Sequence, residues 1–184
     1  MKLELKIRPA KKTDKAQVLS FCRHTFSWGD YIEKIWDTWQ KQKNLLVLEK
    51  NSEPVGICNA AFSPNQLWIE GIRINPEYRR QGCASRLVNA AETMARRKNL
   101  EISRMIVAKN NTKSMAMAKS NGYSLEQIWC LYNLTPKKCI SKAKIATDSK
   151  NLGTLCFGAY SQSWNWFSLE QKSPVSYTHL RAHE

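Results

Sequence analysis

The feature that most constrains the fold is a set of three apolar runs between residues 45 and 74, with turn residues between them. The runs read LLVLEK, VGICNAAF and QLWIEGIRI, at residues 45–50, 55–62 and 66–74. Runs of this length that are joined by short turns containing Asn, Ser and Pro predict adjacent antiparallel strands. We therefore expect a sheet with at least three strands in this part of the chain.

The segments on either side of these strands predict helices and further strands. Before them, period-two alternation over residues 3–8 favours a strand, and two amphipathic helices follow, of which the second begins near Asp30. After them we expect a helix from about residue 83, a strand at 104–109, a helix at 111–120 and one or two strands at 124–134. This order predicts an α/β fold with a mixed sheet, in which the N-terminal half is antiparallel and crossover helices occupy the C-terminal half.

Composition narrows the class of protein and its partners. A chain of 184 residues with 42% hydrophobic residues fits one soluble globular domain and part of another. A net charge of +14 attracts the phosphates of a nucleic acid, an acidic membrane surface or a phosphorylated cofactor, without choosing among them. The six cysteines form no Cys-x-x-Cys pair, so we expect no metal site. No apolar run approaches the roughly 18 residues that span a membrane, and the N-terminus has no secretory pattern. We expect a cytoplasmic protein with no membrane partner.

Four segments are expected along the chain. Residues 3–134 contain the predicted α/β domain, residues 135–150 read as a basic linker, and the aromatic-rich residues 151–174 read as the start of a truncated C-terminal unit. The last ten residues, VSYTHLRAHE at 175–184, resemble a translated sequencing adapter rather than any protein family, so we expect a non-native tail there. Without that tail His24 is the only histidine, which excludes a catalytic scheme that needs two.

The loop NPEYRRQGCASRL, at residues 75–87, is the strongest candidate for a binding site. A helix start presents unpaired N–H groups and the positive end of the helix dipole, so it can bind a phosphate. Gly82 lets the backbone approach a ligand closely, and Arg79 and Arg80 add attraction for a pyrophosphate. The sequence contains neither Gly-x-x-x-x-Gly-Lys-Ser/Thr nor Gly-x-Gly-x-x-Gly, which argues against the commoner nucleotide-binding loops. A solvated basic turn is the alternative.

The sequence RRQGCA, at residues 79–84, fits every position of the pattern Gln/Arg-x-x-Gly-x-Gly/Ala. On this loop the chain resembles the Gcn5-related N-acetyltransferase (GNAT) superfamily, whose acetyl-CoA loop has that form. The residues that lead into the loop resemble the family's fourth strand, and Asn111 followed by Gly122-Tyr123 resembles its second cofactor segment. The order of elements agrees with the family over residues 3–134.

The resemblance implies an enzyme that transfers the acetyl group of acetyl-CoA to a primary amine. It places the pyrophosphate on the backbone N–H groups of residues 80–85, and pairs the pantetheine arm with the backbone of Ile72 and Ile74. An N–H of that strand would stabilise the oxyanion that forms when the amine attacks. The residues expected to hold acetyl-CoA are Ile72, Arg73, Ile74, Arg79, Arg80, Gln81, Gly82, Cys83, Ala84, Ser85 and Asn111.

Glu70 is the expected catalytic base, because an amine is protonated at neutral pH and must lose a proton before it can attack. Its position before the cofactor loop is similar to that of the catalytic glutamate in the histone-acetyltransferase branch of the family. Burial between Trp68 and Ile72 on one face of the strand is expected to raise the pKa of Glu70. The alternative is a glutamate that faces solvent or holds a structural arginine.

The sequence does not identify the general acid that would protonate the departing thiolate. Many family members have a tyrosine seven residues after the asparagine, where Ala118 stands in this chain. A thiolate is stable enough to leave without a strong acid, so this difference does not exclude activity. Tyr123, Tyr132 or a water are the remaining candidates.

The acceptor amine is expected to lie against the two N-terminal helices and their connection. Trp28 and Tyr31 are the candidate substrate-binding residues in this segment, whereas Trp36 and Trp39 have the helical spacing of core residues. Asp30 is expected to cap the second helix. The segment also resembles, more loosely, a GNAT branch that includes histidine N-acetyltransferases, which points to a small-molecule, amino-acid or peptide amine.

Two alternatives from other functional classes stay open. A binding module that keeps acetyl-CoA without catalysis would account for Ala118. A nucleic-acid-binding protein would account for the net charge, although no helix-turn-helix, aromatic RNA motif or zinc module is present and the lysines are scattered. The sequence does not predict an oligomeric state.

Overall fold

The computed structural model describes residues 5–27, 29–63, 65–130, 159–162 and 165–168. The chain divides into two compact units, Met1–Tyr123 and Ser124–Glu184, and each is described by itself. Within the described residues, no helix is both long enough and apolar enough to cross a membrane.

The first unit is built on a five-stranded mixed sheet in the order β1-β2-β3-β4-β5. Its strands are β1 (Leu5–Pro9), β2 (Leu45–Lys50), β3 (Glu53–Ser63), β4 (Gln66–Ile74) and β5 (Ile102–Arg104). The pairs from β1 to β4 are antiparallel, and β5 pairs with β4 in parallel. This topology confirms the predicted fold class. The strand expected at 104–109 is misplaced, since β5 begins at Ile102 and ends at Arg104.

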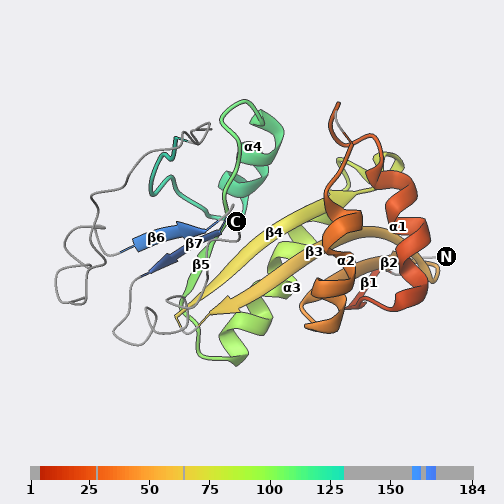
Figure 1. Cartoon of the computed structure of the whole chain (residues 1–184), viewed down its shortest axis with the longest axis horizontal. Coiled ribbons are helices and arrows are strands. Elements are labelled where there is room, and N and C mark those ends of the chain that lie inside the picture. Colours follow the sequence, from red (N-terminus) through yellow and green to blue (C-terminus); the bar gives the residue numbers. More distant parts are fainter. Residues whose placement is uncertain (1–4, 28, 64, 131–158, 163–164, 169–184) are drawn as a thin grey trace, which may run out of the picture. The chain divides into compact units, whose positions relative to one another are not determined.

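Helices cover both faces of this sheet (Figure 1). They are α1 (Lys15–Cys22), α2 (Ile32–Lys41), α3 (Cys83–Arg97) and α4 (Thr112–Ser120), with the short 3-10 turns η1 (Lys12–Asp14) and η2 (Pro76–Tyr78). The helices α1 and α2 pack on one face with Trp36 and Trp39 in the core, as predicted, and α3 packs on the other face. The first helix ends at Cys22, before Phe26, and the second begins two residues after Asp30.

A bulge interrupts the pairing of β3 with β4. Asn59 pairs with Glu70 and Ile57 pairs with Arg73, so two residues of β4, Gly71 and Ile72, lie opposite one residue of β3. Gly71 has a φ of +63°, and a Cβ there would lie 2.6 Å from the ring of Trp39. Only glycine therefore fits at this point of the strand.

The bulge changes which residues of β4 share a face. Asn59 lies between Cys58 and Ala60, which belong to the core on the α3 side, so Asn59 and its partner Glu70 face α1 and α2. Ile72 packs with the core on the α3 side. The expectation that Ile72 shares a face with Glu70 is therefore wrong, because the extra residue shifts the alternation.

After the bulge, β4 has a neighbouring strand on one side only. β5 pairs with β4 only at Gln66–Trp68, whereas β3 pairs with it as far as Ile74. Asn75 N–H donates to the carbonyl of Val55 on β3 (2.9 Å), so the backbone groups of Ile74 face the opposite side by alternation. Within the first unit's described residues, this end of β4 thus has one edge that no strand covers.

The described part of the second unit contains one antiparallel hairpin, β6 (Ala159–Gln162) and β7 (Asn165–Ser168). Residues 124–130 form no strand, so that part of the strand prediction at 124–134 is wrong. Residues 131–134, the predicted linker at 135–150 and the predicted tail at 175–184 lie outside the described residues. The segment boundaries predicted for the C-terminal third stay predictions.

Candidate active site

The loop between β4 and α3 has the backbone geometry of an anion-binding turn. Arg80 and Gly82 both have a positive φ, of 64° and 73°, and the helix begins directly afterwards, where Arg86 N–H donates to the carbonyl of Gly82 (3.1 Å). The N–H groups of the first turn of α3 have no carbonyl four residues earlier in the helix, so they are available to a ligand. A Cβ at Gly82 would have no heavy atom within 4 Å, so the loop is open at this position.

Several side chains of this loop hold the loop itself in place. Arg79 Nε donates to the carbonyl of Ile74 (3.2 Å), and Gln81 Nε2 donates to the carbonyl of Glu77 (3.0 Å). Ser85 Oγ accepts from Asn121 Nδ2 (2.9 Å), which ties the end of α4 to the start of α3. The arrangement therefore presents backbone N–H groups to a ligand and uses three predicted cofactor side chains to fix the loop.

The remaining predicted cofactor residues take different positions. Cys83 is buried on the α3 side of the sheet, Ala84 is half-buried, and the side chain of Arg80 is exposed. Asn111 caps α4, because its Oδ1 accepts from Ser114 N–H (3.1 Å). Asn121, which contacts the first turn of α3, was not predicted as a site residue, since the sequence Asn-Gly only indicated a helix end.

Glu70 lies on the face of the sheet that α1 and α2 cover. Asn59 Nδ2 donates to its Oε1 (2.9 Å). Burial raises the pKa of Glu70 above that of an ordinary glutamate, and the hydrogen bond from Asn59 opposes part of this effect. Glu70 is thus a carboxyl group with a weakened preference for its ionised form, as predicted, although Ile72 lies on the other face of the sheet.

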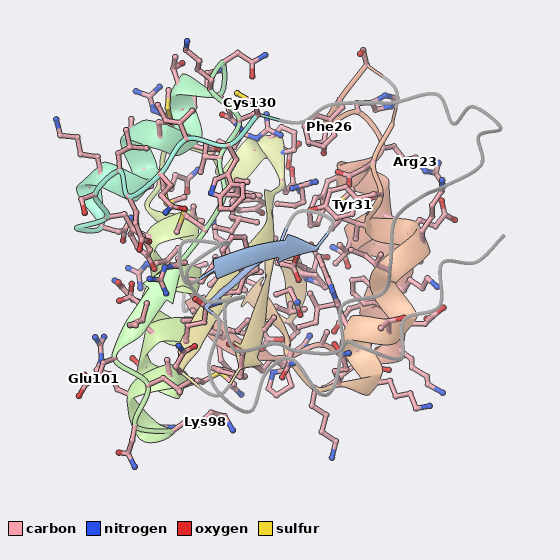
Figure 2. The ribbon with its side chains drawn as sticks, turned by 60° about the vertical axis from the view of Figure 1, so that its left-hand side comes forward. Arg23, Phe26, Tyr31, Lys98, Glu101 and Cys130 are labelled. Carbon is pink, nitrogen blue, oxygen red and sulfur yellow. The ribbon has the colours of Figure 1, made fainter. Side chains whose placement is uncertain are left out.

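A buried ion pair joins the connection between α1 and α2 to β4. Arg73 Nε donates to Asp30 Oδ2 (2.6 Å) and its Nη2 donates to Oδ1 (3.1 Å). The Arg73 and Asp30 side chains are 11% and 4% exposed. The Arg73 guanidinium lies 5.1 Å from the ring centroid of Phe26 and 5.2 Å from that of Tyr31. Figure 2 labels these two aromatic residues on the segment that follows α1.

This ion pair revises the role of Arg73. Its side chain holds the expected acceptor segment and points away from the cofactor loop, because the bulge places Arg73 on the same face as Glu70. The expected cap at Asp30 is displaced by one residue, because Tyr31 occupies the N-cap position of α2, although Asp30 Oδ1 accepts from Ile32 N–H (3.1 Å) at the start of that helix. The contact between Asp30 and Arg73 spans 43 positions of sequence, so no local pattern predicts it.

Tyr31 contacts the Arg73 guanidinium of this ion pair, and its phenol lies near enough to Glu70 to sense that charge. Burial raises the pKa of Tyr31, the charge of Arg73 opposes this shift, and the charge of Glu70 adds to it. The phenol is therefore neutral at physiological pH. Its ring also packs edge-on against Trp39, with centroids 6.3 Å apart. Trp28, the other predicted substrate residue, lies outside the described residues.

Tyr123, one of the candidate acids, is fixed on the α3 side of the sheet. Its hydroxyl donates to Glu92 Oε1 (2.8 Å) and bonds with Ser103, and burial raises its pKa. Tyr132 lies outside the described residues, and Ala118 is buried. Within the described residues no group of His, Cys, Asp and Glu side chains could hold a metal ion.

Known structures share this fold. A transcriptional regulator from Bacillus halodurans C-125 matches with a TM-score of 0.64 and 20% identity, over 71% of this chain and 100% of its own. An aminoglycoside 6'-N-acetyltransferase, AAC(6')-Ih from Acinetobacter baumannii, matches with a TM-score of 0.60 and 18% identity, over 73% and 100%. AAC(6')-Iy in complex with the bisubstrate analog CoA-S-monomethyl-acetylneamine matches with a TM-score of 0.60 and 17% identity, over 74% and 99%. No curated protein sequence matches the chain.

The bulged mixed sheet and the loop before α3 define the protein as an α/β protein with a loop that can bind a phosphate. The sequence profile of the Acetyltransferase (GNAT) family matches residues 14–123, which is more than half of the chain. The chain belongs to this family and is an acetyl-CoA-dependent N-acetyltransferase.

Proposed function

We propose that this enzyme acetylates the primary amine of a small molecule, an amino acid or a peptide by direct attack of the amine on acetyl-CoA, with Glu70 as the general base. The observation that carries the proposal is the position of Glu70. It is a half-buried carboxyl group with a raised pKa, next to the bulge of β4, where the strand has an uncovered edge. We expect the reaction to take place in the cytoplasm.

The residues at the other end of this strand fit acetyl-CoA. The positive end of the α3 dipole, the two positive φ values in the loop and the open space at Gly82 suit a pyrophosphate that approaches the backbone closely. The exposed guanidinium of Arg80 adds positive charge there. The backbone N–H of Ile74 faces the uncovered edge of β4, where an amide-containing arm can pair with it, while the Ile74 carbonyl accepts from Arg79 Nε. Bound at this place, acetyl-CoA supplies the acyl group as a thioester.

Glu70 would take the proton that the ammonium group of the acceptor must lose. The ionised carboxylate accepts this proton at Oε, and the electron pair of the broken N–H bond becomes the nucleophile. A base works best when its pKa lies near the working pH, and burial moves Glu70 in that direction. The departing thiolate needs no strong acid, which agrees with the absence of a tyrosine at Ala118.

The surroundings of Glu70 suit a cationic amine. Asp30 and Arg73 neutralise each other, so Glu70 contributes the net charge at this place. Phe26 and Tyr31 supply aromatic surface that can lie against the body of an acceptor or against its ammonium group. Some of the proteins with this fold are aminoglycoside 6'-N-acetyltransferases, and aminoglycosides are small-molecule amines, which agrees with the proposed class.

A panel of amines, amino acids and short peptides tests the proposal with the purified full chain. Release of CoA thiol and acetylation of the amine, seen by mass spectrometry, are expected for at least one member, with a rate that falls at low pH. Binding of acetyl-CoA without thiol release for any amine would contradict the proposal and favour a non-catalytic binding module.

A further inference from the structure

Asn59 on β3 has a buried side-chain amide in which only one of the two polar atoms forms a hydrogen bond. The residue is 1% exposed, and its Nδ2 donates to Glu70 Oε1 (2.9 Å). Its Oδ1 is buried and has no hydrogen-bond partner among the described residues. A buried amide oxygen without a partner costs free energy, so such an atom calls for an explanation.

We propose that Asn59 is the positioning residue of the general base, and that its amide keeps a hydrogen bond to Glu70 in both protonation states. It donates from Nδ2 to the carboxylate, and it accepts at Oδ1 from the carboxylic acid once the proton of the amine has arrived. This inference rests on the proposed role of Glu70 as base.

The chemistry of the two groups requires the amide to turn. A carboxylate only accepts hydrogen bonds, so an ionised Glu70 must meet the Nδ2 side of the amide, as it does here. After proton transfer Glu70 carries an O–H group, which needs an acceptor. Rotation of the Asn59 amide by half a turn about its last side-chain bond brings Oδ1 to that O–H. One N–H bond of the ammonium breaks and one O–H bond forms, and no further reactant is needed.

Asn59 can control the protonation of Glu70 because the other titratable groups near Glu70 are neutral or paired. From the α1–α2 connection the phenol of Tyr31 and the Asp30–Arg73 ion pair face this region. From β3 the neighbouring thiol of Cys58 has a pKa of about 12 owing to its burial, so it is neutral at physiological pH. Among the described residues, Asn59 is the one that donates a hydrogen bond to Glu70.

The position on the sheet keeps the pair aligned. Asn59 and Glu70 are direct cross-strand partners, so their Cβ atoms lie on the same face and close together. The bulge begins at the next residue of β4, which turns the strand away and leaves Glu70 as the last residue in regular register with β3 on this side. The hydrogen bond thus fixes the carboxyl group at the point where the strands change direction.

Nuclear magnetic resonance of the labelled full chain, without any amine, tests the proposal. The side-chain carbon of Glu70 reports its protonation, and the side-chain N–H signals of Asn59 report its hydrogen bond; loss of each signal in Glu70→Gln and Asn59→Leu assigns it. We expect the Asn59 signals to change with pH at the same midpoint as Glu70, and to be independent of pH in Glu70→Gln. Asn59 signals that stay constant while Glu70 titrates would overturn the proposal.

Asn59→Leu gives the second readout, because leucine has a similar volume and can neither donate nor accept. A hydrogen bond to a charged group is about twice as strong as a neutral one, so its loss should raise the Glu70 midpoint by about one pH unit. Ile57→Val, on the same strand and face, is the control and should leave the midpoint unchanged. An unchanged midpoint in Asn59→Leu would also overturn the proposal.

The two proposals fail in different ways. If Glu70→Gln acetylates amines as fast as the parent, the base assignment is wrong, whatever the resonances of Asn59 do. If Glu70→Gln loses activity but Asn59→Leu keeps both the midpoint and the acid limb of the parent, only the role of Asn59 is wrong. Should Asn59→Leu fail to fold, the titration of Asn59 in the parent chain still decides the matter.

Discussion

The two ends of the active site are built in different ways. At the cofactor loop the hydrogen bonds are local: Asn75 accepts from Glu77 N–H, Arg79 donates to Ile74, and Gln81 donates to Glu77. At the acceptor end the contacts join distant parts of the chain, as in the pair Asp30–Arg73. A site made of local backbone geometry is visible in a short motif, whereas a site made of tertiary contacts depends on the whole fold.

The two ends also differ in electrostatics. The loop is exposed and positive, and it has its effect through N–H groups and a helix dipole that need no desolvation. At the acceptor end Asp30 neutralises the buried Arg73, and the half-buried carboxyl group of Glu70 has a raised pKa. This contrast predicts that substitutions at the two ends change binding and chemistry separately.

The largest difference between the effect on chemistry and the effect on cofactor binding is expected for Glu70→Gln. Removal of a positioned base slows proton transfer by about 10²- to 10⁴-fold, so kcat/KM should fall by that factor while the Kd for acetyl-CoA stays unchanged. In the parent, kcat/KM should fall as the pH drops through the raised pKa of Glu70, because only the ionised form is a base. This limb should be absent in Glu70→Gln. Steady-state kinetics between about pH 5 and pH 9 would show the fall in kcat/KM and the missing acid limb. A parallel loss of affinity for acetyl-CoA in Glu70→Gln would contradict the separation of binding from chemistry.

The next largest effect is expected for Asp30→Asn, compared with Asp14→Asn. Both aspartates are buried and accept two hydrogen bonds from one arginine, Arg73 and Arg8 respectively. Loss of the Asp30 charge leaves the buried Arg73 without its ion-pair partner, so Asp30→Asn should lose about 3 kcal/mol in the free energy of unfolding, measured by urea denaturation. Asp14→Asn should lose less, because Arg8 keeps its ion pair with Glu49.

Only one of these two variants should affect the reaction. Asp30→Asn loosens the segment that carries Tyr31, so its KM for the amine should rise, whereas Asp14→Asn should keep the KM of the parent. Equal KM values in the two variants would show that the Asp30–Arg73 pair supports the fold alone.

Tyr123→Phe should have a smaller effect, confined to stability. The change removes the hydrogen bonds to Glu92 and Ser103 on the α3 side of the sheet, at a cost of about 1–2 kcal/mol in the free energy of unfolding. Because this hydroxyl is committed to those two residues, kcat should stay within about twofold of the parent. A loss of kcat of about 100-fold, with normal folding, would instead identify Tyr123 as the general acid.

The smallest effect is expected for the thermal stability of Glu70→Gln. A carboxyl group whose pKa is raised in the folded state costs stability above that pKa, and this cost disappears as the pH falls below the pKa of an ordinary glutamate. The Tm of Glu70→Gln should therefore exceed that of the parent above neutral pH by a few degrees at most, and the difference should shrink toward acid pH. Calorimetry at several pH values tests this; a lower Tm at alkaline pH would contradict a raised pKa.

Much of the fold could be predicted from the sequence, because its periodicities are local. The three apolar runs gave the antiparallel strands, and the spacing of Trp36 and Trp39 identified the buried side of α2. The loop before α3 was also predictable, since a strand, a glycine and a helix start follow one another in the chain.

What could not be predicted depends on the bulge of β4. Strict alternation places Ile72 beside Glu70, but the extra residue at Gly71 reverses the faces and turns the Arg73 side chain toward Asp30. A glycine inside a strand pattern is a signal of such a bulge. Asn59 had a signal too, as a polar residue within an apolar strand, but its partner Glu70 follows only from the strand register.

Calorimetric titration of acetyl-CoA tests the central claim most directly, with the parent, Gly82→Glu, Ser52→Glu and Glu70→Gln. Gly82 and Ser52 both have a positive φ, of 73° and 68°, and Ser52 lies in the turn between β2 and β3, so the two variants place the same charge at a left-handed backbone position. We predict that Gly82→Glu weakens binding by at least about 10-fold, and that Ser52→Glu and Glu70→Gln bind as the parent does. Parent-like binding by Gly82→Glu would contradict the assignment of the loop before α3 as the acetyl-CoA site.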